Sequence, residues 1–385
     1  MKRDAIQTIS LPAADGGLEP YQVREPKAFR KPSKPFTRIA YAATHVVADP
    51  LSPKEPWLDA AIDWEATIAY RRHLSSWGFG IAEAMDTAQR GMGLDWTNSL
   101  ELIRRTLASV AGAVVASGAG TDHLTGAASV SEVISAYEMQ CTAIEKMGGR
   151  IILMASRALA ASAKSPDDYA RVYDRILGQV KEPVIIHWLG EMFDPALAGY
   201  WGKQDHYQAM DICLSVIEKN KNKVDGIKIS LLDKDKEIAM RRKLPQGVRM
   251  YTGDDFNFAE LIEGDAQGYS DALLGIFDSI APAASQALTF LSENQNAEYH
   301  ETLAPTVPLS RHIFKAPTRF YKTGVVFMAW LNGHQEHFVM VGGQQSARNV
   351  LHLAELFRLA DAAGLLADPG LACKRMKQLL SLHGI

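Results

Sequence analysis

Cysteine is scarce in this sequence, and the three that occur, Cys141, Cys213 and Cys373, lie far apart. A disulfide framework or a zinc cluster needs more cysteines at shorter spacings, so neither is expected. The chain also lacks an excess of basic residues, because 41 Lys and Arg stand against 44 Asp and Glu and the net charge is -3. This balance argues against a nucleic-acid-binding protein, which usually carries a basic surface.

Long hydrophobic runs are missing as well. The longest apolar stretches, 107–117 and 324–331, are shorter than the roughly 20 residues that a bilayer-spanning helix requires. The segment from Met1 to Asp4 is polar and has no apolar run of the kind found in secretory signals. Of the 385 residues 47% are hydrophobic and 22% charged, which is typical of a globular protein. We therefore expect a cytoplasmic protein without a membrane partner.

Short apolar runs alternate with longer amphipathic segments from Arg38 onward, a pattern typical of parallel strands joined by helices. The runs lie at 38–43, 79–82, 112–117, 150–155, 183–188, 224–229, 248–252 and 272–276. Eight consecutive units predict a closed (β/α)8 TIM barrel over 38–282. An open doubly wound sheet is less favoured, because no Gly-x-Gly-x-x-Gly motif follows the first run.

The two ends of the chain differ from this pattern. Residues 1–37 contain repeated prolines and predict an extended N-terminal arm without a core of its own. Residues 283–385 are mostly helical in pattern and predict a C-terminal helical extension. Because an arm and a tail of this kind often reach a neighbouring subunit, we expect a homo-oligomer.

Lys228 interrupts an otherwise apolar run at 226–229. A strand that is covered on both faces should not hold an unpaired ammonium group. Burial lowers the pKa of a lysine and favours the neutral amine, which attacks a carbonyl carbon to form a Schiff base. An edge strand with Lys228 facing water, or an ion pair with Asp254, would explain the same residue without any catalysis.

Several motifs resemble those of the dihydrodipicolinate synthase and N-acetylneuraminate lyase family. Residues 224–228 (Val-Asp-Gly-Ile-Lys) resemble its sixth-strand signature, and residues 251–255 (Tyr-Thr-Gly-Asp-Asp) are similar to the turn after its seventh strand. Residues 118–121 (Gly-Ala-Gly-Thr) resemble the Gly-x-Gly-Thr after the third strand, and Ala281-Pro282 resembles the Asn-x-x-Pro stretch. The family consists of TIM-barrel class I aldolases, so the resemblance implies that Lys228 forms an imine and that no metal or organic cofactor takes part.

Two departures from the family pattern indicate a divergent branch. His187 occupies the position on the fifth strand where relatives have a tyrosine that relays protons, and an imidazole can do this near neutral pH. The second-strand Gly-Thr-Thr-Gly-Glu, which binds a carboxylate in relatives, is replaced by residues 78–87 with Glu83 among them. Glu83 would repel the carboxylate of a 2-oxo acid, so a hydroxyl-rich ketone becomes an alternative substrate.

The reacting groups of a TIM barrel lie at the carboxyl ends of its strands. The sequence therefore predicts a lyase in which Lys228 attacks a small carbonyl substrate and His187 moves protons. The residues expected to bind the substrate at the same end are Glu83, Thr121, Asp122, Arg157, Gly253, Asp254 and Asp255.

Two other functions stay open. Nitrogen and oxygen donors near strand ends could hold a divalent metal, as in a metal-dependent aldolase or a sugar isomerase. These donors are His45, Glu83, Asp122, His123, His187 and Asp254, although no His-x-His or His-Glu-x-x-His spacing supports them. A barrel without catalysis that serves in binding or assembly is the other possibility. A scaffold has no reason to keep an ammonium group inside its barrel, so Lys228 argues against it.

Overall fold

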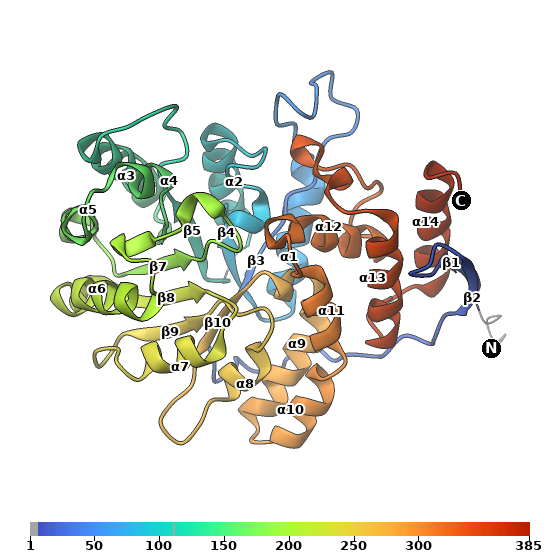
Figure 1. The fold of residues 1–385 in the computed structure, drawn as a ribbon. Coiled ribbons are helices and arrows are strands. Elements are labelled where there is room, and N and C mark those ends of the chain that lie inside the picture. Colours follow the sequence, from blue (N-terminus) through green and yellow to red (C-terminus); the bar gives the residue numbers. More distant parts are fainter. Residues whose placement is uncertain (1–6, 111) are drawn as a thin grey trace.

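The computed structural model describes residues 7–110 and 112–385. Its centre is a closed barrel of parallel strands in the order β10-β3-β4-β5-β6-β7-β8-β9, so the last strand pairs with the first (Figure 1). The predicted (β/α)8 TIM barrel is therefore confirmed. Its strands are β3 (Ala40–Ala43), β4 (Gly80–Glu83), β5 (Val115–Ala119), β6 (Arg150–Met154), β7 (Val184–Leu189), β8 (Val224–Ser230), β9 (Arg249–Thr252) and β10 (Asp271–Leu274).

Helices join these strands and cover the outside of the barrel. Asp63 marks the start of the first by accepting a hydrogen bond from the Ala66 N–H at 3.0 Å, and Ser129 with Glu132 forms a reciprocal cap on the third. No helix in the described part of the chain is long and apolar enough to cross a membrane. The helices are α1 (Trp64–Ser76), α2 (Trp96–Ser109), α3 (Val130–Lys146), α4 (Arg157–Ser162), α5 (Pro166–Gln179), α6 (His206–Lys219), α7 (Lys234–Arg241), α8 (Phe258–Glu263) and α9 (Ile276–Ser292).

Side chains along each strand point alternately into the barrel and toward the helices. Tyr41, Ala82, Ile152, Ile185 and Tyr251 come from strands all around the ring and pack in one cluster, which is the barrel interior. Every second residue from these positions shares their face. This alternation decides which polar side chains at the strand ends can reach a common site.

The N-terminal segment contains more structure than its prolines predict. β1 (Thr8–Pro12) and β2 (Leu18–Gln22) form an antiparallel hairpin beside the C-terminal helices, at the side of the molecule away from the barrel (Figure 1). Ile9 and Leu11 are only 2% and 0% exposed. The Tyr21 hydroxyl donates a hydrogen bond of 2.7 Å to Asp361. The expectation of a segment without any core is wrong for this hairpin, because its alternating apolar residues face the extension.

The C-terminal extension begins without a break in the chain. Pro282, the expected end of the barrel, lies inside α9, which has a non-helical residue at Ile280. Pro282 has no N–H for the carbonyl of Asp278 four residues earlier, and the Tyr70 hydroxyl donates to that oxygen at 2.6 Å instead. α9 thus continues and packs against the extension. The further helices are α10 (Asn296–Leu303), α11 (Thr306–Ile313), α12 (Tyr321–Leu331), α13 (Val350–Ala362) and α14 (Pro369–Leu382).

Candidate active site

Lys228 lies inside the barrel near the carboxyl end of β8 and is only 7% exposed. It shares the inward face because it pairs with His187 of β7, two residues after the interior side chain of Ile185. Burial lowers the pKa of Lys228, while the charges of Asp255 and Asp86 oppose this shift. The sequence left open an edge strand facing water, but β8 is paired on both sides and its lysine is buried.

A small space of about 10 Å³, called the lysine cavity below, adjoins Lys228 and has room for one water-sized group. Asp255 is its most deeply buried acid and accepts a hydrogen bond of 2.9 Å from the N–H of Ile276. Burial raises the pKa of Asp255 to about 7, although the Ile276 N–H and the Lys228 charge act the other way. A proton can therefore move on and off this carboxyl near neutral pH. The other lining residues are Ala43, Met85, Asp86, Thr87, Leu189, Phe193, Ser230, Gly275 and Tyr321.

His187 is buried beside Lys228 and faces a different space. Its Nε2 lies 3.3 Å from the hydroxyl of Ser230, which lines the lysine cavity, and its Nδ1 has no partner among the described residues. Burial holds the pKa of His187 well below its usual range, and the Lys228 charge adds to this effect. The imidazole is therefore neutral at pH 7 and can accept a proton through Ser230.

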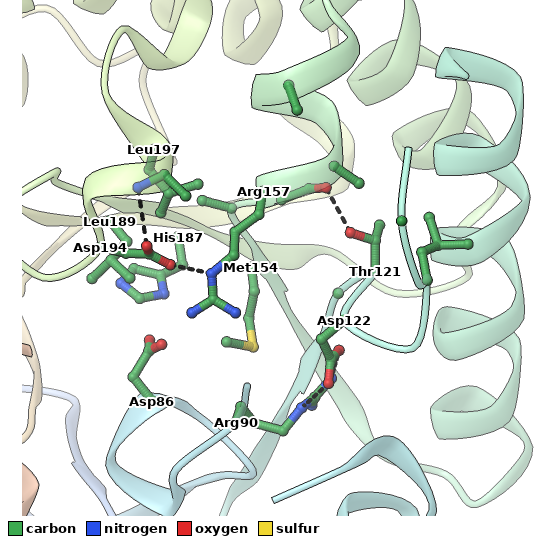
Figure 2. A pocket seen from close by; sticks show the side chains of 18 residues that line it. Asp86, Arg90, Thr121, Asp122, Met154, Arg157, His187, Leu189, Asp194 and Leu197 are labelled. Carbon is green, nitrogen blue, oxygen red and sulfur yellow. Dashed lines mark hydrogen bonds and ion pairs between the residues drawn. The ribbon is translucent and has the colours of Figure 1, made fainter. Parts of the chain in front are cut away.

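A larger cavity of about 510 Å³ adjoins the lysine cavity, and Asp86 and Leu189 line both. Figure 2 shows the carboxylate of Asp86, the guanidinium group of Arg157 and the ring of His187 directed toward this space. Arg157 forms an ion pair with Asp194 across the cavity wall.

Thr121 and Asp122, from the loop after β5, line the same cavity. The Thr121 hydroxyl lies 2.6 Å from that of Ser156. Asp122 accepts a hydrogen bond of 2.9 Å from Nε of Arg90, and this guanidinium group holds the pKa of the carboxyl below its usual value although burial acts against it. Thr121, Asp122, Arg157 and His187 are thus brought together as the sequence pattern predicts.

Glu83 does not join this group. Its neighbour Ala82 points into the barrel, so Glu83 points outward between α1 and α2. Both of its oxygens accept hydrogen bonds of 2.9 Å from Arg71, and Thr106 and the Ala84 N–H donate to them at 2.6 and 2.8 Å. Glu83 lines neither cavity, and its contacts are those of a buried structural ion pair rather than a substrate contact.

Asp254 is also turned away from both cavities. Its carboxylate accepts hydrogen bonds from the N–H groups of Phe256 and Asn257, at 2.8 and 3.0 Å, and closes the turn after β9. The acids whose charges reach Lys228 are Asp255 and Asp86, so the ion pair between Lys228 and Asp254 that the sequence left open is not formed. Gly253, in contrast, packs directly against the lysine. A Cβ there would lie 2.7 Å from Cε of Lys228.

The donors considered for a metal are engaged in separate contacts. Nδ1 of His45 lies 2.8 Å from Asp278, and Nδ1 of His123 lies 2.8 Å from the amide of Gln140. Glu83 and Asp122 are paired with arginines. Within residues 7–110 and 112–385, no group of three or more His, Cys, Asp or Glu side chains is placed to hold a metal ion.

Some residues at the site carry no expected role in the sequence pattern. Tyr321, from α12 of the extension, lines the lysine cavity, and its hydroxyl lies 2.8 Å from that of Thr87. The next residue, Lys322, is buried and donates to the carbonyl of Arg319 at 3.1 Å. Burial lowers the pKa of Lys322 to about 8, and the nearby charge of Asp86 opposes this shift. Ser230 could have been found, because it lies two residues after Lys228 on the same strand face.

Asp255 makes the stability of the fold depend on pH. Its pKa is about 7 in the folded chain against an ordinary 3.8, so between these values the folded chain holds a proton that the unfolded chain has lost. The free energy of unfolding therefore decreases as the pH rises from about 4 to about 7. Asp255→Asn is expected to remove on the order of 3 kcal/mol of the change between about pH 5 and about pH 8, measured by urea unfolding.

Glu237 provides the comparison for this experiment. Burial raises its pKa to about 8, so its ionisation also lowers the free energy of unfolding as the pH rises. Glu237→Gln should remove its own part of the slope and leave the part due to Asp255. If the free energy of unfolding of Asp255→Asn still depended on pH as strongly as that of the natural chain, the raised pKa of Asp255 would be contradicted.

Comparison with known proteins gives a family and a shared fold. A family model described as "Protein of unknown function (DUF993)" matches residues 9–385. No curated protein matches the chain. Dihydrodipicolinate synthase from Aquifex aeolicus is similar in structure, with 12% identity, a TM-score of 0.64, and 86% of this chain and 99% of that chain covered.

Two further solved structures agree. Dihydrodipicolinate synthase from Thermotoga maritima has 15% identity, a TM-score of 0.63 and coverage of 86% and 99%. The 4-hydroxy-tetrahydrodipicolinate synthase from Methylacidiphilum fumariolicum SolV has 16% identity, a TM-score of 0.62 and coverage of 90% and 99%. At such identities the likeness establishes the fold, which is the one that the motifs around Lys228 and Gly253 predicted.

Proposed function

The chain belongs to the DUF993 family, and we propose that it is a Schiff-base-forming lyase of the class I aldolase type, acting on a small carbonyl compound through Lys228. The observation that carries the proposal is the buried amine of Lys228, whose pKa is lowered, beside a cavity near the carboxyl ends of the strands. A lysine of this kind supplies the neutral nucleophile that imine formation requires. The fold shared with dihydrodipicolinate synthases supports the same conclusion.

The first step joins the amine to the substrate. The nitrogen of neutral Lys228 attacks the carbonyl carbon and forms a C–N bond, and the carbonyl oxygen takes up protons and leaves as water. The product is a protonated imine. When the bond between the α and β carbons of the substrate breaks, its electron pair moves into the imine and gives a neutral enamine. The leaving fragment becomes a carbonyl compound as its hydroxyl proton passes to a base. Protonation of the enamine and addition of water then release the second product and restore Lys228.

Two groups beside Lys228 can carry these protons. Asp255 titrates near neutral pH in the lysine cavity itself. His187 is neutral and reaches the same cavity through the hydroxyl of Ser230, at 3.3 Å. We assign Asp255 to the proton exchange at the imine and His187 to the proton of the leaving fragment, because His187 also faces the larger cavity.

The size of the two cavities fits a substrate of two parts. The lysine cavity has room for a carbonyl group, and the larger cavity can take the remainder. Thr121, Asp122 and Arg157 line the larger cavity and offer hydroxyl, carboxylate and guanidinium contacts. A 2-oxo acid and a hydroxyl-rich ketone are the two substrate classes considered.

Borohydride trapping tests the proposal. Borohydride reduces a protonated imine to a stable secondary amine, so incubation with pyruvate or hydroxyacetone should leave an adduct on Lys228, located by mass spectrometry of peptides. Lys228→Arg should abolish it, since a guanidinium group stays protonated and forms no imine. Lys322 is the internal comparison, because it is the other lysine among the described residues that is buried and has a lowered pKa. An adduct on Lys322 instead of Lys228, or none with either ketone, would contradict the proposed reaction.

A further inference from the structure

The arginines that line the two cavities are paired with acids, whereas two of the described lining acids are not paired with a cation. Of the described side chains that line them, the cationic ones are Arg90, Arg157 and Lys228. Arg90 is paired with Asp122, and Arg157 is paired with Asp194. Lys228 must be uncharged to attack a carbonyl group. Each arginine is thus matched by an acid of the same cavity, and among the described lining residues no uncompensated cation lies beside Lys228 to neutralise an anionic group of the substrate there.

Two lining acids, Asp255 and Asp86, have no ion pair among the described residues. Asp255 is bound by the N–H of Ile276, which leaves Asp86 as the one whose carboxylate has no such contact. It follows β4 in a short helical turn at 86–88 and is half-buried, with its carboxylate directed into the larger cavity (Figure 2).

The charge of Asp86 acts on Lys228 and also on Lys322 of α12. The positive charge of Lys322 weakens the field of Asp86. Lys322 cannot contact a substrate itself, because its amine donates to the carbonyl of Arg319 and its side chain lines neither cavity.

The position of Asp86 defines which part of a substrate it meets. It lines both cavities, so it lies where a substrate passes from one to the other. If the carbonyl group occupies the lysine cavity, the atom bonded to the carbonyl carbon lies at this passage. A carboxylate there would meet a like charge in a poorly solvated site, whereas a hydroxyl group could donate a hydrogen bond to Asp86.

We infer that Asp86 selects ketones whose carbonyl carbon bears a hydroxymethyl group rather than a carboxylate. The inference rests on the imine chemistry proposed for Lys228 and narrows its substrate class to hydroxy ketones. Asp86 takes the part that the sequence pattern assigned to Glu83, three residues earlier, which faces away from the site.

Hydroxyacetone and pyruvate form a matched pair of probes, because both are methyl ketones and differ only in a CH₂OH or a carboxylate group. The rate of borohydride-trapped adduct formation on Lys228 is measured for each ketone at the same concentration. The natural chain should react at least about tenfold faster with hydroxyacetone. Asp86→Asn removes the charge while keeping the shape, and should shift the ratio of the two rates about tenfold or more toward pyruvate.

Asp211→Asn is the control, since it removes one negative charge from the exposed surface of α6, where Asp211 pairs with Lys243. It should leave the ratio unchanged, and an equal shift in this variant would overturn the inference. A natural chain that prefers pyruvate, or an Asp86→Asn protein with an unaltered ratio, would also overturn it while leaving Lys228 as the nucleophile. Absence of any Lys228 adduct would instead overturn the proposed function and this inference with it. If Asp86→Asn fails to fold, Asp86→Ser and the preference of the natural chain decide the question.

Discussion

Arg71→Met is expected to lower the free energy of unfolding by about 3–5 kcal/mol, because it leaves the Glu83 carboxylate buried without its partner. Both side chains of this pair are 0% exposed. Arg71 donates to both oxygens of Glu83 at 2.9 Å and also to the carbonyl of Thr67 at 3.2 Å. The loss should appear as a lower midpoint in urea unfolding with an unchanged denaturant slope.

The exposed pair of Arg104 and Glu101 gives the matched control, because Arg104 is 57% exposed there and the pair lies on the surface of α2. Arg104→Met should cost no more than about 1 kcal/mol. If Arg71→Met and Arg104→Met lowered the free energy of unfolding equally, the buried pair would contribute no more to stability than the exposed one. Glu83→Gln separates the two roles considered for this residue: a structural acid changes the unfolding midpoint, whereas a substrate contact changes the trapping rate at constant stability.

The barrel could be predicted because each strand leaves a local mark in the sequence. A strand covered on both faces is a short apolar run, and the helix that follows is amphipathic, so the eight predicted runs overlap the eight strands. The hairpin of residues 8–22 could not be predicted in this way, because its burial depends on a distant part of the chain. Its prolines are typical of a loop, and its apolar strand β1 packs against α13 and α14, some 340 residues later in the chain.

Lys228 and His187 could be singled out because a polar residue within an apolar run is unusual wherever it lies. Glu83 shows the limit of that approach. It stands at the carboxyl end of β4 as expected, but a strand has two faces, and only the packing of Ala82 into the barrel determines that Glu83 faces the helices. Knowledge of the strand alone does not supply its register, and a shift of one residue exchanges inside for outside.

Tyr321, and the direction of the Asp86 side chain after β4, illustrate a second limit. Tyr321 begins a helix of the extension, more than 90 residues after Lys228, and reaches the lysine cavity only because α12 packs against α9 and the barrel. Asp86 belongs to a turn after β4, where the periodicity of the strand no longer determines the direction of a side chain. Such residues are placed by tertiary packing and turn geometry, so hydrophobic periodicity does not reveal their function.

Gly253→Ala is expected to slow adduct formation on Lys228 by on the order of a hundredfold, because an added Cβ would displace the amine from its position. That Cβ would lie 2.7 Å from Cε of Lys228, 2.4 Å from Oγ of Ser230 and 2.5 Å from the carbonyl oxygen of Ile229. The same crowding should lower the free energy of unfolding by about 1–3 kcal/mol. Oγ of Ser230 would have to move at the same time, so its contact with His187 would be disturbed together with the nucleophile.

Gly80→Ala separates these effects, because it crowds the barrel interior at the start of β4, where an added Cβ would lie 2.8 Å from the ring of Tyr41. It should cost a similar free energy of unfolding while leaving the rate of adduct formation within about threefold, since Lys228 is not among the atoms that it meets. If both alanine variants trap the ketone equally well, the amine does not lie against residue 253. The reacting nitrogen would then have to be sought elsewhere than between Gly253 and Ser230, and the assignment of the lysine cavity as the reaction site would fail with it.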